Sequence, residues 1–286
     1  MTETTEAPPK EEAKPSAPKG KKFGWKRAFG WMVGMVVGGV LGIGLLSLSI
    51  GYARADAVDA KGKPSDIVSF APYGEGYRTY SWLGNGLLGR QYARRDVRRV
   101  LLNAFQAKDH KAGRNHVLAD VGNSNGNPKK ALSGHISHKN GLAVDVHLPL
   151  KRGKVAAEMP TSIWNLWGYL WRFDETGKLA GRTFNRRSGS LGCKQRNQPW
   201  NWEGAGDPSY EVDFEELALF LKAVRDESRK SPSLRLKKVI LWPPFQRRLK
   251  KVAPGLFKGK GRVPFSKDCV WVIHDEHVHL HFKPVK

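Results

Sequence analysis

The sequence predicts an α+β protein that follows one N-terminal apolar helix. Three observations indicate this: an uncharged run long enough to cross a bilayer, segments with the apolar spacing of helices, and short apolar or alternating segments typical of strands. The helices and strands lack the regular order of βαβ units, which favours α+β over a doubly wound fold. We therefore expect a small antiparallel sheet flanked by helices.

The N-terminal region predicts a disordered tail and a membrane anchor. Residues 1–27 are rich in Glu, Lys, Pro, Ala and Thr and have no apolar period. The run 28–53 contains no charged residue and exceeds the roughly 20 residues that a transmembrane helix needs. We expect an uncleaved signal anchor, and the small-residue pattern Ala53-Arg54-Ala55 keeps a cleaved signal sequence as the alternative.

The distribution of charge predicts where the rest of the chain lies. Lys and Arg gather just before the apolar run, so the positive-inside rule puts the tail in the cytoplasm and the rest in the periplasm. The formal net charge is +23, and residues 1–30 hold seven Lys and Arg against four Glu, so +20 belongs to the exported part. We expect the cytoplasmic membrane and an anionic wall polymer as partners, and no nucleic acid.

After a linker at 54–64, residues 65–286 have the size of one domain. Helical spacing is present at 94–107, 162–173 and 213–225. The last of these helices should begin at an Asp213 cap, with Glu216 three residues later. Strands are predicted at 117–121, 142–148, 239–242, 270–273 and 277–282, and a long surface loop at 182–208.

Most histidines fall in two segments, 133–145 (SGHISHKNGLAVD) and 274–282 (HDEHVHLHF). Side chains alternate between the faces of a strand, so Val278, Leu280 and Phe282 would face the core. The other face of that strand would carry the histidines His277, His279 and His281.

A strand at 142–148 would place Asp145 where it can meet His279, if the two strands pair. His138 would reach the same place from the turn before Gly141. Two imidazoles and a carboxylate, with a fourth position open, form a catalytic zinc site. The sequence therefore predicts Zn²⁺ bound by His138, Asp145 and His279.

These segments resemble a known family, the penicillin-insensitive murein endopeptidases. That family belongs to the zinc peptidases that include lysostaphin-type enzymes, D-Ala-D-Ala peptidases and the hedgehog fold. The resemblance lies in SGHxSHxxGLxxD, in HxxHxH and in Gly74-Glu75-Gly76-Tyr77-Arg78, and it covers most of residues 65–286. It implies the same zinc ligands, a hedgehog-like fold and hydrolysis of peptidoglycan cross-links between D-Ala and meso-diaminopimelate.

The resemblance also implies roles for further histidines. His277 would be the general base, His274 would assist catalysis at the oxyanion, and His135 would line the site. The sequence departs from the family pattern in three places: the turn 126–132 (GNPKKAL) before the first histidine is altered, Ala143 stands where an Asp is usual, and His281 is an additional histidine that we place at the lining of the site. Two alternatives stay open: a non-catalytic zinc-binding or wall-binding module of the same fold, and a D-Ala-D-Ala carboxypeptidase or amidase.

Other patterns give weaker signals. Residues 122–126 match G-x-S-x-G, but Pro128 follows where a nucleophile elbow would lead into a helix, so a serine hydrolase is disfavoured. No H-E-x-x-H is present, which excludes a helix-borne zinc site of that type. Cys193 and Cys269 are both exported under this topology, so a disulfide between them is permitted.

Overall fold

The structure is a computed structural model that describes residues 25–56, 62–81, 89–111, 114–122, 138, 140–159, 171–182, 204–266 and 276–285. The chain divides into two compact units, Met1–Gly42 and Ile43–Lys286. The described part is of mixed α+β type, with four α-helices and several small sheets. This agrees with the predicted class.

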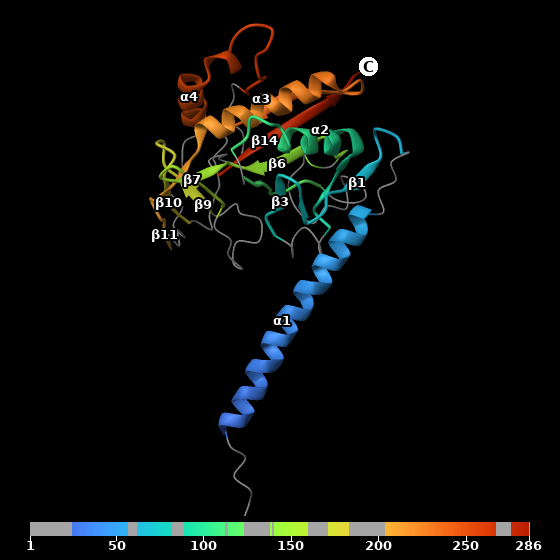
Figure 1. Cartoon of the computed structure of the whole chain (residues 1–286), viewed down its shortest axis with the longest axis vertical. Coiled ribbons are helices and arrows are strands. Elements are labelled where there is room, and N and C mark those ends of the chain that lie inside the picture. Colours follow the sequence, from blue (N-terminus) through green and yellow to red (C-terminus); the bar gives the residue numbers. More distant parts are fainter. Residues whose placement is uncertain are drawn as a thin grey trace, which may run out of the picture. The chain divides into compact units, whose positions relative to one another are not determined.

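Helix α1 (Trp25–Asp56) is the long blue helix in Figure 1. Its segment Met32–Ala55 has a mean hydropathy of 2.2 and is long and apolar enough to cross a membrane or to act as a signal sequence. The helix extends a few residues beyond both ends of the predicted span 28–53. The predicted apolar helix is confirmed, and its role as an uncleaved anchor stays a prediction.

The central sheet has six strands in the order β13-β14-β6-β5-β3-β2. Their bounds are β2 Tyr73–Gly74, β3 Tyr77–Thr79, β5 His116–Leu118, β6 Ala143–His147, β13 Leu234–Ile240 and β14 His277–Pro284. The expectation of an antiparallel sheet is wrong at one pair, because β3 and β5 run parallel. The chain between them contains helix α2 (Arg95–Phe105), and a helix-bearing crossover is the usual way to join parallel strands.

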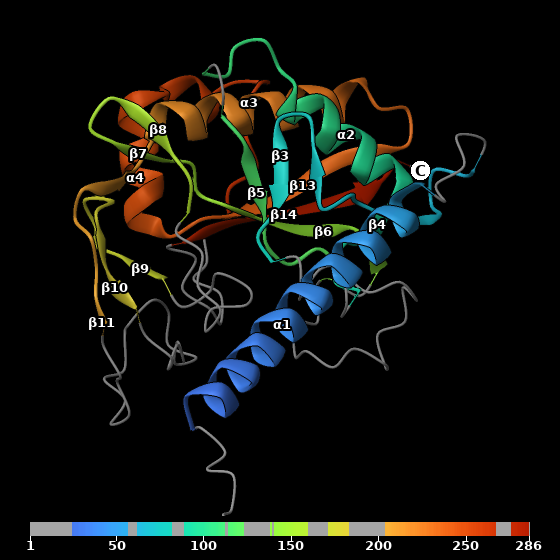
Figure 2. The same cartoon turned by 60° about the horizontal axis from the view of Figure 1, so that its bottom comes forward.

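Helix α2 and helix α3 (Phe214–Lys230) lie side by side over one face of this sheet, as Figure 2 shows. Both were expected from apolar spacing. Helix α3 begins as predicted, because the Asp213 side chain caps it by accepting a hydrogen bond from the Glu216 backbone N–H at 3.2 Å. Helix α4 (Pro243–Val252) was not expected. Strand β13 has already ended at Ile240, and Pro243 and Pro244 suit the first turn of a helix.

The core lies between these helices and the apolar face of the sheet. Val278, Leu280 and Phe282 of β14 are fully buried there, together with Val144 and Val146 of β6. The predicted alternation along β14 is thus confirmed, with the histidines on the opposite face. The strand that closes the core therefore also carries the candidate site.

Three smaller sheets complete the described fold. They are β1 (Ile67–Ser69) with β4 (Tyr92–Arg94), β12 (Tyr210–Val212) with β7 (Leu150–Arg152) and β8 (Val155–Ala157), and β11 (Gly204–Ala205) with β10 (Leu179–Arg182) and β9 (Trp171–Phe173). A 3-10 helix, η4, spans Pro254–Leu256.

Two expectations are corrected in the third of these sheets. The helix expected at 162–173 does not reach its predicted end, because Trp171 and Phe173 are buried on either side of the less buried Arg172, the period of a strand. Within the loop expected at 182–208, Arg182 belongs to β10 and Gly204–Ala205 form β11. Residues 160–170, the predicted strand 270–273, Cys193 and Cys269 lie outside the described residues.

Candidate metal centre

Strands β6 and β14 pair antiparallel, and their register sets Asp145 opposite His279. The side chains meet, with His279 Nδ1 2.7 Å from Asp145 Oδ1. Both side chains project from the face of the sheet that does not pack on α2 and α3. The predicted pairing of the two segments, with these two residues as neighbours across the strands, is confirmed.

The third candidate ligand, His138, precedes the turn into β6. Its Nε2 lies 3.3 Å from Asp145 Oδ2, and its ring stands at 86° to the ring of His279, with centroids 5.1 Å apart. His138 Nδ1 donates a hydrogen bond to the Val121 backbone oxygen at 2.9 Å, and this bond turns Nε2 toward Asp145. The structure therefore brings all three predicted ligands together.

The turn that delivers His138 depends on a glycine. Gly141 has φ +67°, a left-handed conformation that side chains disfavour. A Cβ at this position would lie 2.8 Å from the Arg94 backbone nitrogen and 2.7 Å from Ile67 Cδ1. The Gly-Leu step in the sequence motif thus has a structural reason, because only glycine lets the chain turn this closely past β1 and β4.

His138, Asp145 and His279 are all buried, and one ligand atom from each lies within 4.8 Å of the other two. Two imidazoles and one carboxylate form a donor set that suits zinc and similar transition-metal ions. Asp145 and His279 come from paired sheet strands, and His138 comes from the turn that leads into β6. These residues can hold a metal ion.

The charges in this group are strongly coupled. Burial lowers the pKa of His138, but the negative charges of Asp145 and Asp120 outweigh it and raise this pKa to about 9. Burial raises the pKa of Asp145, and the neighbouring His138 and His277 outweigh that effect and hold it well below its usual range. The Asp145 carboxylate is thus negatively charged and attracts cations, as a metal site requires.

His277 lies beside the three candidate ligands. Its Nε2 is 3.7 Å from Asp145 Oδ2, and its Nδ1 is 3.1 Å from Glu276 Oε1. Glu276 is fully buried, and its carboxylate orients the His277 ring so that Nε2 faces the ligand group. The sequence reasoning missed Glu276, although an acidic residue next to a candidate base was the available signal.

His147 also belongs to this part of the sheet. It is opposite His277 in the strand register, its Nδ1 donates to the Glu276 backbone oxygen at 3.2 Å, and its ring centroid lies 4.8 Å from that of Tyr80. Burial, followed by the charge of His277, lowers its pKa to about 3. His147 is therefore neutral at physiological pH and packs beside His277.

The remaining predicted site residues differ in their placement. His281 is half-buried on the same face, its ring centroid 6.4 Å from that of His279. Burial and the charge of His279 lower the pKa of His281 to about 4. His135 and His274 lie outside the described residues, so their roles stay predictions.

No family model matches the sequence, and no curated protein matches it. The likeness to murein endopeptidases therefore depends on the sequence motifs alone. A metal bound by His138, Asp145 and His279 would keep a coordination position for a water molecule or a substrate oxygen. A histidine beside the ligands can move protons at that position.

Proposed function

We propose that the chain is a zinc-dependent endopeptidase that hydrolyses the peptide cross-links of peptidoglycan, at the bond between D-Ala and meso-diaminopimelate. One observation carries the proposal: the buried ligand group His138, Asp145 and His279 has a histidine, His277, 3.7 Å from its carboxylate. Three protein ligands and an adjacent base are the parts of a hydrolytic zinc site. The motifs that led to the murein endopeptidases contain these same residues.

The residues present fit zinc. Zinc accepts imidazole nitrogen and carboxylate oxygen and favours sites whose ligands are oriented by further hydrogen bonds. His138 has such a bond to the Val121 backbone oxygen. When bound here, zinc would supply a Lewis acid that polarises the scissile carbonyl and makes a water molecule more acidic.

The protein groups would handle the protons of the reaction. An amide is a poor electrophile and its amine a poor leaving group, so water must lose a proton and the amine must gain one. Glu276 holds His277 through Nδ1, so that Nε2 is the atom that accepts a proton from water and then donates it to the leaving amine. His274 would assist at the carbonyl oxygen and His135 would line the site.

The surroundings of the enzyme follow from charge and the apolar helix. We place the basic domain in the periplasm, held at the inner membrane by α1. Peptidoglycan stem peptides carry free carboxylates, and the +20 of the chain after residue 30 would attract them. Peptidoglycan is then both the substrate and the polymer to which the domain binds.

The test uses full-length protein in detergent with intact cross-linked muropeptides, with and without a chelator, and mass spectrometry of the products. We expect cleaved cross-links, no cleavage after chelation and recovery with added zinc. A His277→Ala protein, which keeps the three ligands, controls for cleavage by contaminants.

Other reaction products would contradict the proposal and indicate a different activity. Loss of only a terminal D-Ala would indicate a carboxypeptidase, and release of whole stems from the glycan would indicate an amidase. Zinc binding without any product would indicate a non-catalytic module of the same fold.

A further inference from the structure

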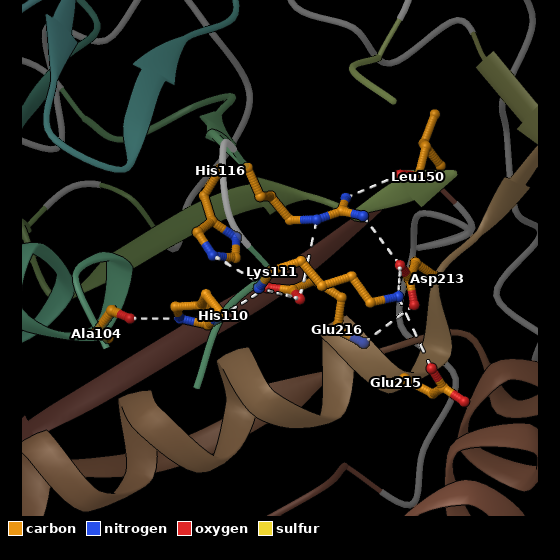
Figure 3. A network of polar contacts seen from close by, with 9 residues as sticks. Ala104, His110, Lys111, His116, Leu150, Asp213, Glu215 and Glu216 are labelled. Carbon is orange, nitrogen blue, oxygen red and sulfur yellow. Dashed lines mark hydrogen bonds and ion pairs between the residues drawn. The ribbon is translucent and has the colours of Figure 1, made fainter. Parts of the chain in front are cut away.

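A second group of histidines lies away from the candidate metal centre. His110 follows helix α2, His116 opens strand β5, and Glu216 is in the first turn of helix α3. Figure 3 shows the three side chains converging from these separate elements. One ligand atom from each lies within 4.8 Å of the other two, and the same is true of His138, Asp145 and His279.

His116 has a ring with unmet hydrogen-bonding capacity. Its side chain is 1% exposed, and within the described part of the chain neither ring nitrogen has a hydrogen-bond partner. The ring is packed between Phe105 and Phe220, with centroids 5.2 Å and 4.7 Å away. Buried polar groups are nearly always hydrogen-bonded because leaving one unsatisfied is costly, so a missing partner is expected.

The position of His116 suits a metal ligand. His116 Nε2 faces Glu216 Oε1 at 3.8 Å, too far for a hydrogen bond but close enough for both atoms to bind one ion.

His110 is oriented as metal-binding histidines usually are. Its Nε2 donates to the Ala104 backbone oxygen at 2.7 Å, which turns Nδ1 toward Glu216 Oε1 at 2.6 Å. A bond from one ring nitrogen to a carbonyl oxygen fixes the tautomer that binds metal through the other nitrogen. His138 and Val121 show the same arrangement in the first centre.

The neighbouring cations Arg114 and Lys111 are paired mainly with another carboxylate, not with Glu216 Oε1. Arg114 and Lys111 lie close by, and both pair with Asp213, at 2.9 Å and 2.7 Å from its Oδ2. Asp213 therefore balances much of their charge. Arg114 approaches only Oε2 of Glu216, at 3.9 Å, whereas both histidines face Oε1.

We propose that His110, His116 and Glu216 form a second zinc site, distinct from the site of hydrolysis. Two imidazoles and a carboxylate again favour zinc over Mg²⁺ or Ca²⁺, which prefer oxygen ligands. The ion links the segment after α2, the start of β5 and the start of α3. Its role is structural, because a metal that binds only the folded chain stabilises the fold.

The experiment counts metal in untagged full-length protein in detergent, after zinc loading and dialysis, by elemental mass spectrometry. An Asp145→Ala/His279→Ala variant removes the first centre and should retain one zinc per chain. Adding His116→Phe, which keeps a ring between Phe105 and Phe220, should remove that zinc. Lys111→Met, added instead, removes an ion pair of the same network but no ligand, and should leave the zinc bound.

Two further measurements keep the test decisive if His116→Phe does not fold. Glu216→Gln keeps the side-chain shape and should also remove the second zinc. Added zinc should raise the melting temperature of the metal-free Asp145→Ala/His279→Ala variant, whereas Mg²⁺ should not. The proposal is overturned if that variant, correctly folded, holds no zinc, or if its zinc survives both His116→Phe and Glu216→Gln.

Discussion

Ala143 and His281 lie directly opposite each other in the β6–β14 pair. Both positions depart from the murein endopeptidase pattern, and the strand register makes them neighbours. A small residue at 143 stands where a second carboxylate would face the histidine strand. The adjacent His281 is an additional imidazole on that strand.

This pairing predicts coupling between the two positions. Ala143→Asp buries a carboxylate opposite residue 281. In a His281→Ala background this carboxylate has no imidazole across the strand pair, and we expect the substitution to lower the unfolding free energy by about 3–5 kcal/mol. With His281 present the cost should be smaller by about 1–2 kcal/mol, because the imidazole can pair with the carboxylate. Urea unfolding of the four proteins of this double-mutant cycle measures the difference. Equal costs in both backgrounds would refute the coupling.

Asp145→Asn should remove the metal from the first centre. The substitution keeps the side-chain shape but removes the charge that His138 and His279 contact at 3.3 Å and 2.7 Å. We expect a loss of one zinc per chain, measured by elemental mass spectrometry. Asp174→Asn makes the same change in the turn after β9 and should leave the zinc content unaltered. Full zinc retention in Asp145→Asn would rule out Asp145 as a ligand.

His277→Ala should separate metal binding from catalysis. The residue is not among the three proposed ligands, so the zinc content should equal that of the wild type. Without a proton carrier, turnover of cross-linked muropeptides should fall about 10²–10⁴-fold. Parallel metal and product analyses on the same preparation test this. Wild-type turnover would assign the general base to another residue.

Glu276→Gln should lower turnover by weakening the orientation of His277. The Gln side chain can still contact Nδ1, 3.1 Å from Oε1 in the wild type, but it no longer carries a charge that favours a protonated ring in the transition state. We expect kcat to fall about 10–100-fold, the range seen when such supporting groups are removed, with zinc content and KM nearly unchanged. A rise in KM with kcat unchanged would instead indicate that Glu276 contacts the substrate.

Gly141→Ala should destabilise the fold more than Gly153→Ala. Both glycines have positive φ, so each alanine costs about 1–2 kcal/mol from the left-handed backbone. A Cβ at 153 meets nothing within 4 Å, whereas at 141 it lies 2.8 Å from the Arg94 nitrogen. Overpacking should add about 1–3 kcal/mol at 141. Thermal unfolding compares them, and equal losses would contradict the close approach.

The alternation of residues along the strands made the centre of the site predictable. His277 to Phe282 and the segment around Asp145 each have one polar and one apolar face, and two such strands bury their apolar faces best side by side. Asp213 with Glu216 likewise marked the start of α3. In each case the signal lies within a few residues of the chain.

The parts that were missed depend on distant residues. The parallel pairing of β3 with β5 and the strand at Trp171 follow from long-range contacts that override local spacing. Glu276 is next to His277, yet its role appears only when its burial is known. The group of His110, His116 and Glu216 joins residues up to 106 positions apart, so no local sequence motif predicts it.

Asp145 and His279, which meet across one strand pair, are 134 positions apart in sequence. Local elements such as α2 and α3 can form before that long loop closes, but the first metal centre cannot. Metal uptake at this centre would therefore report a late step of folding. A partly folded chain would carry no assembled metal centre, so the proposed activity would begin only once the sheet is complete.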